Sequence, residues 1–138
     1  MLDKELALSR NEALYLSDNV TLMIERDHDE TILIGSMRNV APTAPLPVPI
    51  EIIEKLGMAI LYTTDSDNEG KDYIGTFDIN ELYLLREIAQ SFVKINDEQV
   101  GYNLSRKIYK AILQDKYEQD KILNSLLTSD EPLNKTLH

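Results

Sequence analysis

The sequence contains no cysteine, and none of its apolar runs approaches the roughly 20 residues that cross a bilayer. The absence of cysteine excludes a disulfide framework and a thiolate metal site. Residues 1–5, with the sequence M-L-D-K-E, do not form the basic start of a secretory signal. We therefore expect a cytoplasmic protein that does not associate with membranes.

The patterns of common hydrolytic and phosphate-binding chemistries are also missing. There is no G-x-S-x-G nucleophile motif, and the chain has two histidines, His28 and His138. Gly70 and Lys71 lack the upstream glycine spacing and the following hydroxyl of a phosphate-binding loop. The sequence therefore singles out no catalytic, cofactor-binding or metal-binding residue, and we expect no cofactor and no catalytic role.

Negative charge is abundant and unevenly placed. The formal charge is −10, and residues 1–80 hold 15 Asp and Glu against 6 Lys and Arg, whereas residues 81–138 hold 9 against 8. A field of this sign opposes nonspecific binding to nucleic acids and to anionic membranes. We interpret it as a surface that favours solubility. In the alternative, the acidic first half mimics DNA and inhibits a nucleic-acid-binding protein, which requires carboxylates aligned along one face.

The stretch from 73 to 95 predicts a strand followed by a helix. Residues 73–77 are mostly β-branched or aromatic, which is typical of a strand. Asp78 and Glu81 have the spacing of a capping box, in which each side chain accepts a hydrogen bond from the other residue's amide. An apolar stripe follows at steps of three and four residues: Leu82, Leu85, Ile88, Ala89, Phe92 and Ile95. We expect the rest of the chain to pack on this stripe.

A similar unit begins the chain. Residues 5–8 predict a short strand, and Ser9 with Glu12 repeats the capping-box spacing before a helix over about 10–26. A shift of 69 residues aligns the two units with three identities, Asn11/Asn80, Glu12/Glu81 and Leu16/Leu85. Either the chain consists of two strand–helix–helix halves whose strands pair, or any strand followed by a capped helix looks like this.

The segments between the two units predict one further helix. Residues 27–30 predict a charged turn, and 31–34 predict a third strand or buried coil. Four prolines between 36 and 49 predict an extended crossover, because proline removes backbone donors. The helix predicted over 49–62 is apolar around most of its circumference, which is typical of a central core helix or of a subunit interface.

The last part of the chain predicts a long helix with a polar middle. After a turn at 96–99, Gly101 is expected to interrupt the chain before a helix over about 104–127. The polar middle is expected to project past the body, and a second apolar cluster follows it: Ile122, Leu123, Leu126 and Leu127.

The fold class predicted from these elements is α+β, mostly helical, with about four helices and a small two- or three-stranded sheet. We expect residues 1–127 to form a single globular domain and 128–138 a flexible C-terminal tail.

Two acidic segments have some features of a metal site. Residues 65–70 match the first six positions of a calcium-binding loop. Asp72 and Thr76 then stand where the loop requires an apolar residue and a bidentate glutamate, so a polar turn is the better interpretation.

His28 lies between Asp27 and Asp29, and imidazole with carboxylates can ligate a metal or act as a base. Consecutive residues in a turn point in different directions, which favours an exposed turn without a site. A carboxylate-dependent metalloenzyme centred on 27–30 or 65–72 remains an alternative hypothesis.

The leading hypothesis is a non-catalytic protein–protein interaction or assembly domain. An excess of apolar helical surface, together with the missing catalytic patterns, motivates it. The expected partner is a second copy of the chain or another protein, and the expected contact is the helix at 49–62 or the apolar cluster at 122–127.

Overall fold

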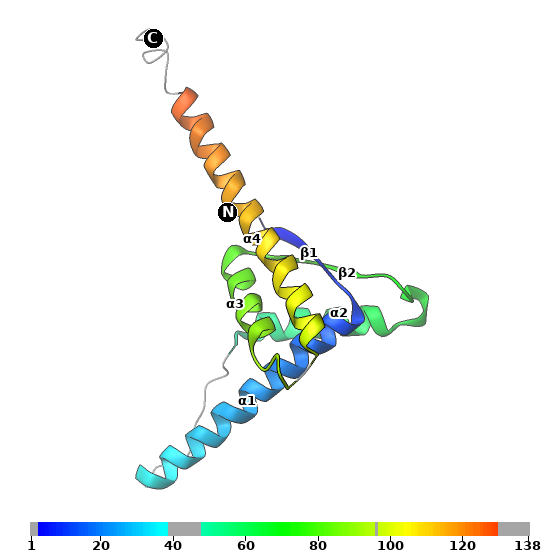
Figure 1. Ribbon diagram of the computed structural model, residues 1–138, viewed down its shortest axis with the longest axis vertical. Helices are drawn as coiled ribbons and strands as arrows, with labels where there is room; N and C mark the ends of the chain where they lie inside the picture. The colour runs from blue at the N-terminus through cyan, green and yellow to red at the C-terminus, as the bar shows by residue number, and fades with distance from the viewer. Residues whose placement is uncertain (1–2, 39–47, 96, 130–138) are drawn as a thin grey trace.

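The computed structural model describes residues 3–38, 48–95 and 97–129 of the chain. They form four α-helices, a short 3-10 helix and a two-stranded antiparallel sheet (Figure 1). In chain order these are β1 (Lys4–Leu8), α1 (Arg10–Arg38), α2 (Ile50–Thr64), η1 (Ser66–Asn68), β2 (Tyr73–Phe77), α3 (Ile79–Gln90) and α4 (Glu98–Ser129). The predicted fold class, α+β and mostly helical, is confirmed.

The two predicted strands pair with each other. The antiparallel register places Leu6 opposite Gly75 at the centre of the ladder. Because side chains alternate across a strand, Leu6 and Leu8 are buried against the helices while Glu5 faces solvent. A Cβ atom on Gly75 would lie 2.9 Å from a ring carbon of Phe77, so glycine at this position leaves room for the buried ring.

Each strand leads directly into a helix through a capping box. The amide of Glu12 donates to Ser9 Oγ at 3.2 Å, and the amide of Ser9 donates to Glu12 Oε1 at 3.0 Å. In the second box the amide of Glu81 donates to Asp78 Oδ1 at 2.7 Å, and the amide of Asp78 donates to Glu81 Oε1 at 3.0 Å. Both capping boxes occur where the sequence predicts them, because the motif depends only on two suitable side chains three residues apart.

The two strand–helix units are equivalent in position. Lys4 and Tyr73 begin the strands and Leu8 and Phe77 end them, each pair 69 residues apart. The pairing is symmetric under the same shift, because Lys4 pairs with Phe77 and Leu8 pairs with Tyr73. The described chain therefore consists of two halves, β1-α1-α2 and β2-α3-α4, whose strands are related by an approximate two-fold axis. The prediction of strand–helix–helix halves agrees with this arrangement.

A lysine of α2 binds the strand–helix junction of the second half. The ammonium of Lys55 donates to the carbonyl oxygen of Thr76 at 2.8 Å and to the two carboxylate oxygens of Glu81 at 2.8 and 3.0 Å. It also lies 5.0 Å from the centre of the Phe77 ring. Glu81 therefore takes part in a charge-assisted contact between helices as well as in its capping box.

A lysine of α4 makes the matching contact with the first half. The ammonium of Lys107 donates to the carbonyl oxygen of Ala7 at 2.8 Å and to Glu12 Oε1 at 2.6 Å. These two acceptors precede the acceptors of Lys55 by 69 residues, so the second helix of each half binds the junction of the other half. Residues 55–61 and 107–113 have the sequences K-L-G-M-A-I-L and K-I-Y-K-A-I-L, which share four letters at an offset of 52 residues.

The core lies between the inner face of the sheet and the four helices, and a tyrosine and a glycine meet at one end of it. Tyr15 is buried, and its hydroxyl donates to the carbonyl oxygen of Ala89 at 2.8 Å. A Cβ atom on Gly101 would lie 2.5 Å from that hydroxyl oxygen. The prediction that Gly101 interrupts the chain is wrong, because it lies inside α4 at the point where Tyr15 approaches the helix backbone.

The helix α3 ends earlier than its apolar stripe predicts. It stops at Gln90, where the side-chain amide of buried Asn19 donates to the carbonyl oxygens of Ile88 and Ser91, both at 2.7 Å. Phe92 then adopts a positive φ of 55°, which turns the chain away from the helix. Phe92 and Ile95 are therefore not part of the α3 stripe, and Ile95 is exposed.

The helix α1 is longer than predicted, since it continues to Arg38. The charged turn expected at 27–30 and the third strand or coil expected at 31–34 are both wrong, because these residues lie in the helix. The sequence contains no proline before Pro42 that would end α1 earlier. The proline-rich crossover predicted over 36–49 falls largely in 39–47, outside the described residues.

The helix α4 begins before its predicted start at 104. Oδ1 of Asp97 accepts hydrogen bonds from the amides of Gln99 and Val100, at 3.0 and 3.2 Å, so Asp97 caps the helix. The turn predicted over 96–99 is therefore wrong for Glu98 and Gln99, which are helical. The long helices α1 and α4 both extend beyond the packed body, in different directions (Figure 1).

Candidate interaction surface

The acidic loop at 65–72 uses its polar groups to hold its own backbone. Oδ1 of Asp65 accepts from the amide of Asp67 at 3.0 Å, and the side-chain amide of Asn68 donates to the carbonyl oxygen of Tyr62 at 3.1 Å. Gly70 has a φ of 75°, a conformation that glycine adopts without strain. These contacts form a polar turn, the structure that the sequence favours over a calcium-binding loop.

The segment at 27–30 lies on α1, with His28 and Asp29 exposed. Oδ1 of Asp27 lies 3.5 Å from Nε of Arg26. Among the residues that the structure describes, no group of three or more His, Asp and Glu side chains is placed to hold a metal ion. Among their described side chains, neither acidic segment presents an assembled metal site.

The apolar helix predicted at 49–62 is α2, and its apolar side chains are divided between the core and the surface. Pro49 stands at the N-cap position, one residue before the first helical residue. Ile52, Leu56 and Ala59 are buried. The exposed apolar side chains of α2 are Ile50, Met58 and Leu61. Of the two interpretations of this helix, a central position in the core explains its buried face.

The last turns of α4 have no counterpart in the first half. By the 52-residue offset between the second helices, Thr64, where α2 ends, corresponds to Lys116. We call residues 116–127 the arm. In Figure 1 it extends away from the rest of the structure, as the polar middle of the predicted helix suggested.

The base of the arm is fixed by Lys4 of β1. Its ammonium donates to Glu118 Oε2 and lies 4.0 Å from Asp115 Oδ1. Asp115 is 3% exposed, and its Oδ2 also accepts from the side-chain amide of Gln119 at 3.0 Å. Because a buried charge is costly without a partner, these contacts favour one direction for α4 as it leaves the body.

The contact with Lys4 also changes the titration of Glu118. The hydrogen bond from Lys4 lowers the pKa of the Glu118 carboxyl below its ordinary value of 4.5. Desolvation acts in the opposite direction but is the smaller effect. Glu118 is therefore held in its charged form at neutral pH.

Apolar side chains are exposed along the arm. Their exposed fractions are 52% for Ile122, 55% for Leu123, 57% for Leu126 and 56% for Leu127. Ile122 and Leu126 continue the spacing of three and four residues set by Ile108, Ile112 and Asp115, which face the core. The core-facing side of α4 thus continues beyond the body as an apolar surface.

The arm is electrically neutral, unlike the chain as a whole. Residues 116–127 contain two lysines, one aspartate and one glutamate, whereas the chain has a formal charge of −10.

The described helices include none long and apolar enough to span a bilayer. Comparison with protein families, with curated protein sequences and with solved structures found no match to this chain.

Proposed function

We propose that the protein is a non-catalytic assembly domain that associates with a second copy of itself through the arm of α4. The observation that supports this proposal is the exposure of the apolar side chains of the arm, where Ile122 continues the side of α4 that is buried nearer the body. Exposed apolar side chains gathered on one segment are typical of protein contacts.

Charge favours a second copy that packs antiparallel. Two bodies with a formal charge of −10 each repel when they lie close together, whereas two neutral arms do not. The arm has 12 residues and is about 18 Å long at 1.5 Å per residue. Antiparallel pairing keeps the bodies at opposite ends of the paired arms, about twice the Debye length of 8–10 Å at physiological salt.

The expected association is weak. Completing the burial of a half-exposed leucine or isoleucine contributes about 1 kcal/mol, so the four such residues of each arm give about 8 kcal/mol in the dimer. The cost of association is of the same order, about 4–15 kcal/mol. With the cost at the low end of that range, about 4 kcal/mol remains, which corresponds to a dissociation constant of about 1 mM.

Sedimentation equilibrium of the full chain, from about 10 µM to about 1 mM, tests this proposal. The wild type should show a monomer–dimer equilibrium with little dependence on salt, because the arms are neutral. Leu123→Lys should abolish the dimer. A wild type that stays monomeric at about 1 mM would overturn the proposal.

Leu61→Lys is the matched control, because Leu61 is an exposed leucine of α2, the other helix that the sequence nominated. This variant should dimerise like the wild type. Loss of the dimer in Leu61→Lys, with Leu123→Lys unaffected, would assign the contact to α2 and contradict the proposed role of the arm.

A further inference from the structure

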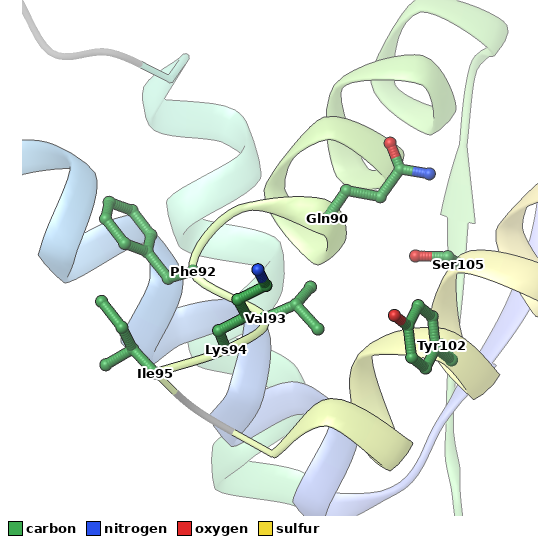
Figure 2. Close-up of a pocket in the computed structure, with 7 residues that line it drawn as sticks. All are labelled: Gln90, Phe92, Val93, Lys94, Ile95, Tyr102 and Ser105. Atoms are coloured by element: carbon green, nitrogen blue, oxygen red, sulfur yellow. The ribbon is translucent and has the colours of Figure 1, made fainter.

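A cleft of about 540 Å³ lies between the turn that follows α3 and the first turns of α4. Gln90, Val93, Lys94, Tyr102 and Ser105 line it, and Phe92 and Ile95 complete its outer edge. Figure 2 shows that Phe92 and Ile95 point away from Tyr102 and Ser105, so the inner wall belongs to the first five residues. This volume is within the range of small-molecule sites, about 300–1,000 Å³.

One polar atom in the wall of the cleft has no hydrogen-bond partner among the residues that the structure describes. Ser105 Oγ is buried, and it makes no hydrogen bond to any other described residue. A buried hydroxyl without a hydrogen bond destabilises a folded protein, so native structures rarely retain one. Because Oγ is buried, an oxygen of a bound molecule would satisfy it after a rotation of the Ser105 side chain toward the cleft.

The turn beside the cleft is held in a strained conformation. Phe92 has a φ of 55°, which is unfavourable for a bulky side chain. Asn19 holds the carbonyl oxygen of Ser91, and the guanidinium of Arg26 lies 5.5 Å from the centre of the Phe92 ring. The wall formed by Val93 and Lys94 is therefore set by contacts with α1 before any ligand arrives.

The chemistry of the wall selects an anion with an apolar body. None of the described residues that line the cleft is an aspartate or a glutamate, although the chain contains 24 of them. Lys94 supplies a positive charge, and Gln90, Tyr102 and Ser105 supply neutral hydrogen-bonding groups. Val93 and the tyrosine ring supply apolar contact.

From the cleft, its unsatisfied serine and its lack of acidic groups, we infer that the protein binds a small organic carboxylate there. The carboxylate accepts hydrogen bonds from Ser105 and Tyr102 and lies near the Lys94 ammonium. The apolar body of the ligand packs on Val93. This binding site is separate from the arm, and it does not depend on self-association.

An NMR titration of the ¹⁵N-labelled full chain tests the inference with three probes that share one ring: benzoate, benzyl alcohol and benzylamine. Benzoate should shift the amides of 91–95 and 101–106 and saturate with a dissociation constant of about 1 mM or lower. Benzyl alcohol should bind about fivefold more weakly, because it lacks the charge, and benzylamine more weakly still. Absence of saturable shifts in these two segments, or equal affinity for the three probes, would overturn the inference.

Two variants with matched controls identify the groups involved. Lys94→Met should weaken benzoate by about fivefold and leave benzyl alcohol unchanged, whereas Lys110→Met, at an exposed lysine of α4, should change neither. Ser105→Ala should weaken both probes, and Ser125→Ala on the arm should weaken neither. Unchanged benzoate affinity in Lys94→Met would contradict the assigned carboxylate. Because Lys94 is exposed, this variant keeps the test decisive even if Ser105→Ala does not fold.

Discussion

Tyr15 on α1 and Gly101 on α4 approach so closely that a Cβ atom on Gly101 would lie 2.5 Å from the tyrosine hydroxyl oxygen. The same hydroxyl donates to the carbonyl oxygen of Ala89 in α3, so one side chain joins three helices. The approach depends on the absence of a side chain at position 101.

Gly101→Ala is expected to lower the free energy of unfolding by about 1–3 kcal/mol, because the added methyl group displaces Tyr15. Tyr15→Phe alone should cost about 1 kcal/mol through its lost hydrogen bond. In the double variant the added methyl group no longer meets a hydroxyl. The double variant should therefore lose less stability than the sum of the losses measured for the two single variants. Urea unfolding of the wild type, the two single variants and the double variant measures this coupling. If the losses of the two single variants simply add in the double variant, the contact between Tyr15 and Gly101 does not contribute to stability.

Lys55→Met and Lys107→Met are expected to destabilise the protein by similar amounts, about 1–2 kcal/mol each. The reason is that both ammonium groups bind a strand carbonyl and a capping-box carboxylate in equivalent positions. Lys110→Met is the control, since Lys110 is exposed on α4. Equal stability of Lys107→Met and Lys110→Met in urea would refute the matching role of Lys107.

Glu118 predicts a specific dependence of stability on pH. Its folded pKa lies below 4.5, so the charged carboxylate contributes stability above that pH, and this contribution is lost as the pH falls through the folded pKa. Glu118→Gln should therefore be less stable than the wild type at pH 7, with the difference shrinking below about pH 4.5. Thermal melts across pH measure it, with Asp120→Asn as the exposed control on the arm. A difference that is constant with pH would contradict the assigned ion pair with Lys4.

Ser105→Ala is expected to leave the free energy of unfolding unchanged or to raise it by about 1 kcal/mol. The serine hydroxyl is buried without a hydrogen bond among the described residues, so its removal relieves a cost. A structural serine would behave in the opposite way. Thermal melts without any added carboxylate measure this, and a loss of about 1 kcal/mol or more would mean that the hydroxyl is satisfied within the protein.

The sequence predicted those parts of the fold that depend on neighbouring residues. The two strands, both capping boxes and the buried face of α2 follow from spacings of two to four residues. The end of α3 could not be predicted in this way, because Asn19, some 70 residues earlier in the chain, binds the carbonyl oxygens that end it. Gly101 was misinterpreted for the same reason, since its partner Tyr15 is distant in sequence.

The equivalence of the two halves had a second sequence signal that the 69-residue alignment does not reveal. The related segments 55–61 and 107–113 lie 52 residues apart, because the first helix of the second half, α3, has 12 residues whereas α1 has 29. The arm was anticipated from its apolar cluster at 122–127. The cleft was not, since no local pattern connects Val93 and Lys94 with Tyr102 and Ser105.

The crossed lysine contacts make each half depend on the other for its stability. Lys55 of the first half binds Glu81 at the strand–helix junction of the second half, and Lys107 of the second half binds Glu12 at the junction of the first. Separating the halves would leave two capping-box glutamates without their cations and two strands without their only described neighbours. Neither half is therefore a self-sufficient folding unit, and the body should unfold in one cooperative transition.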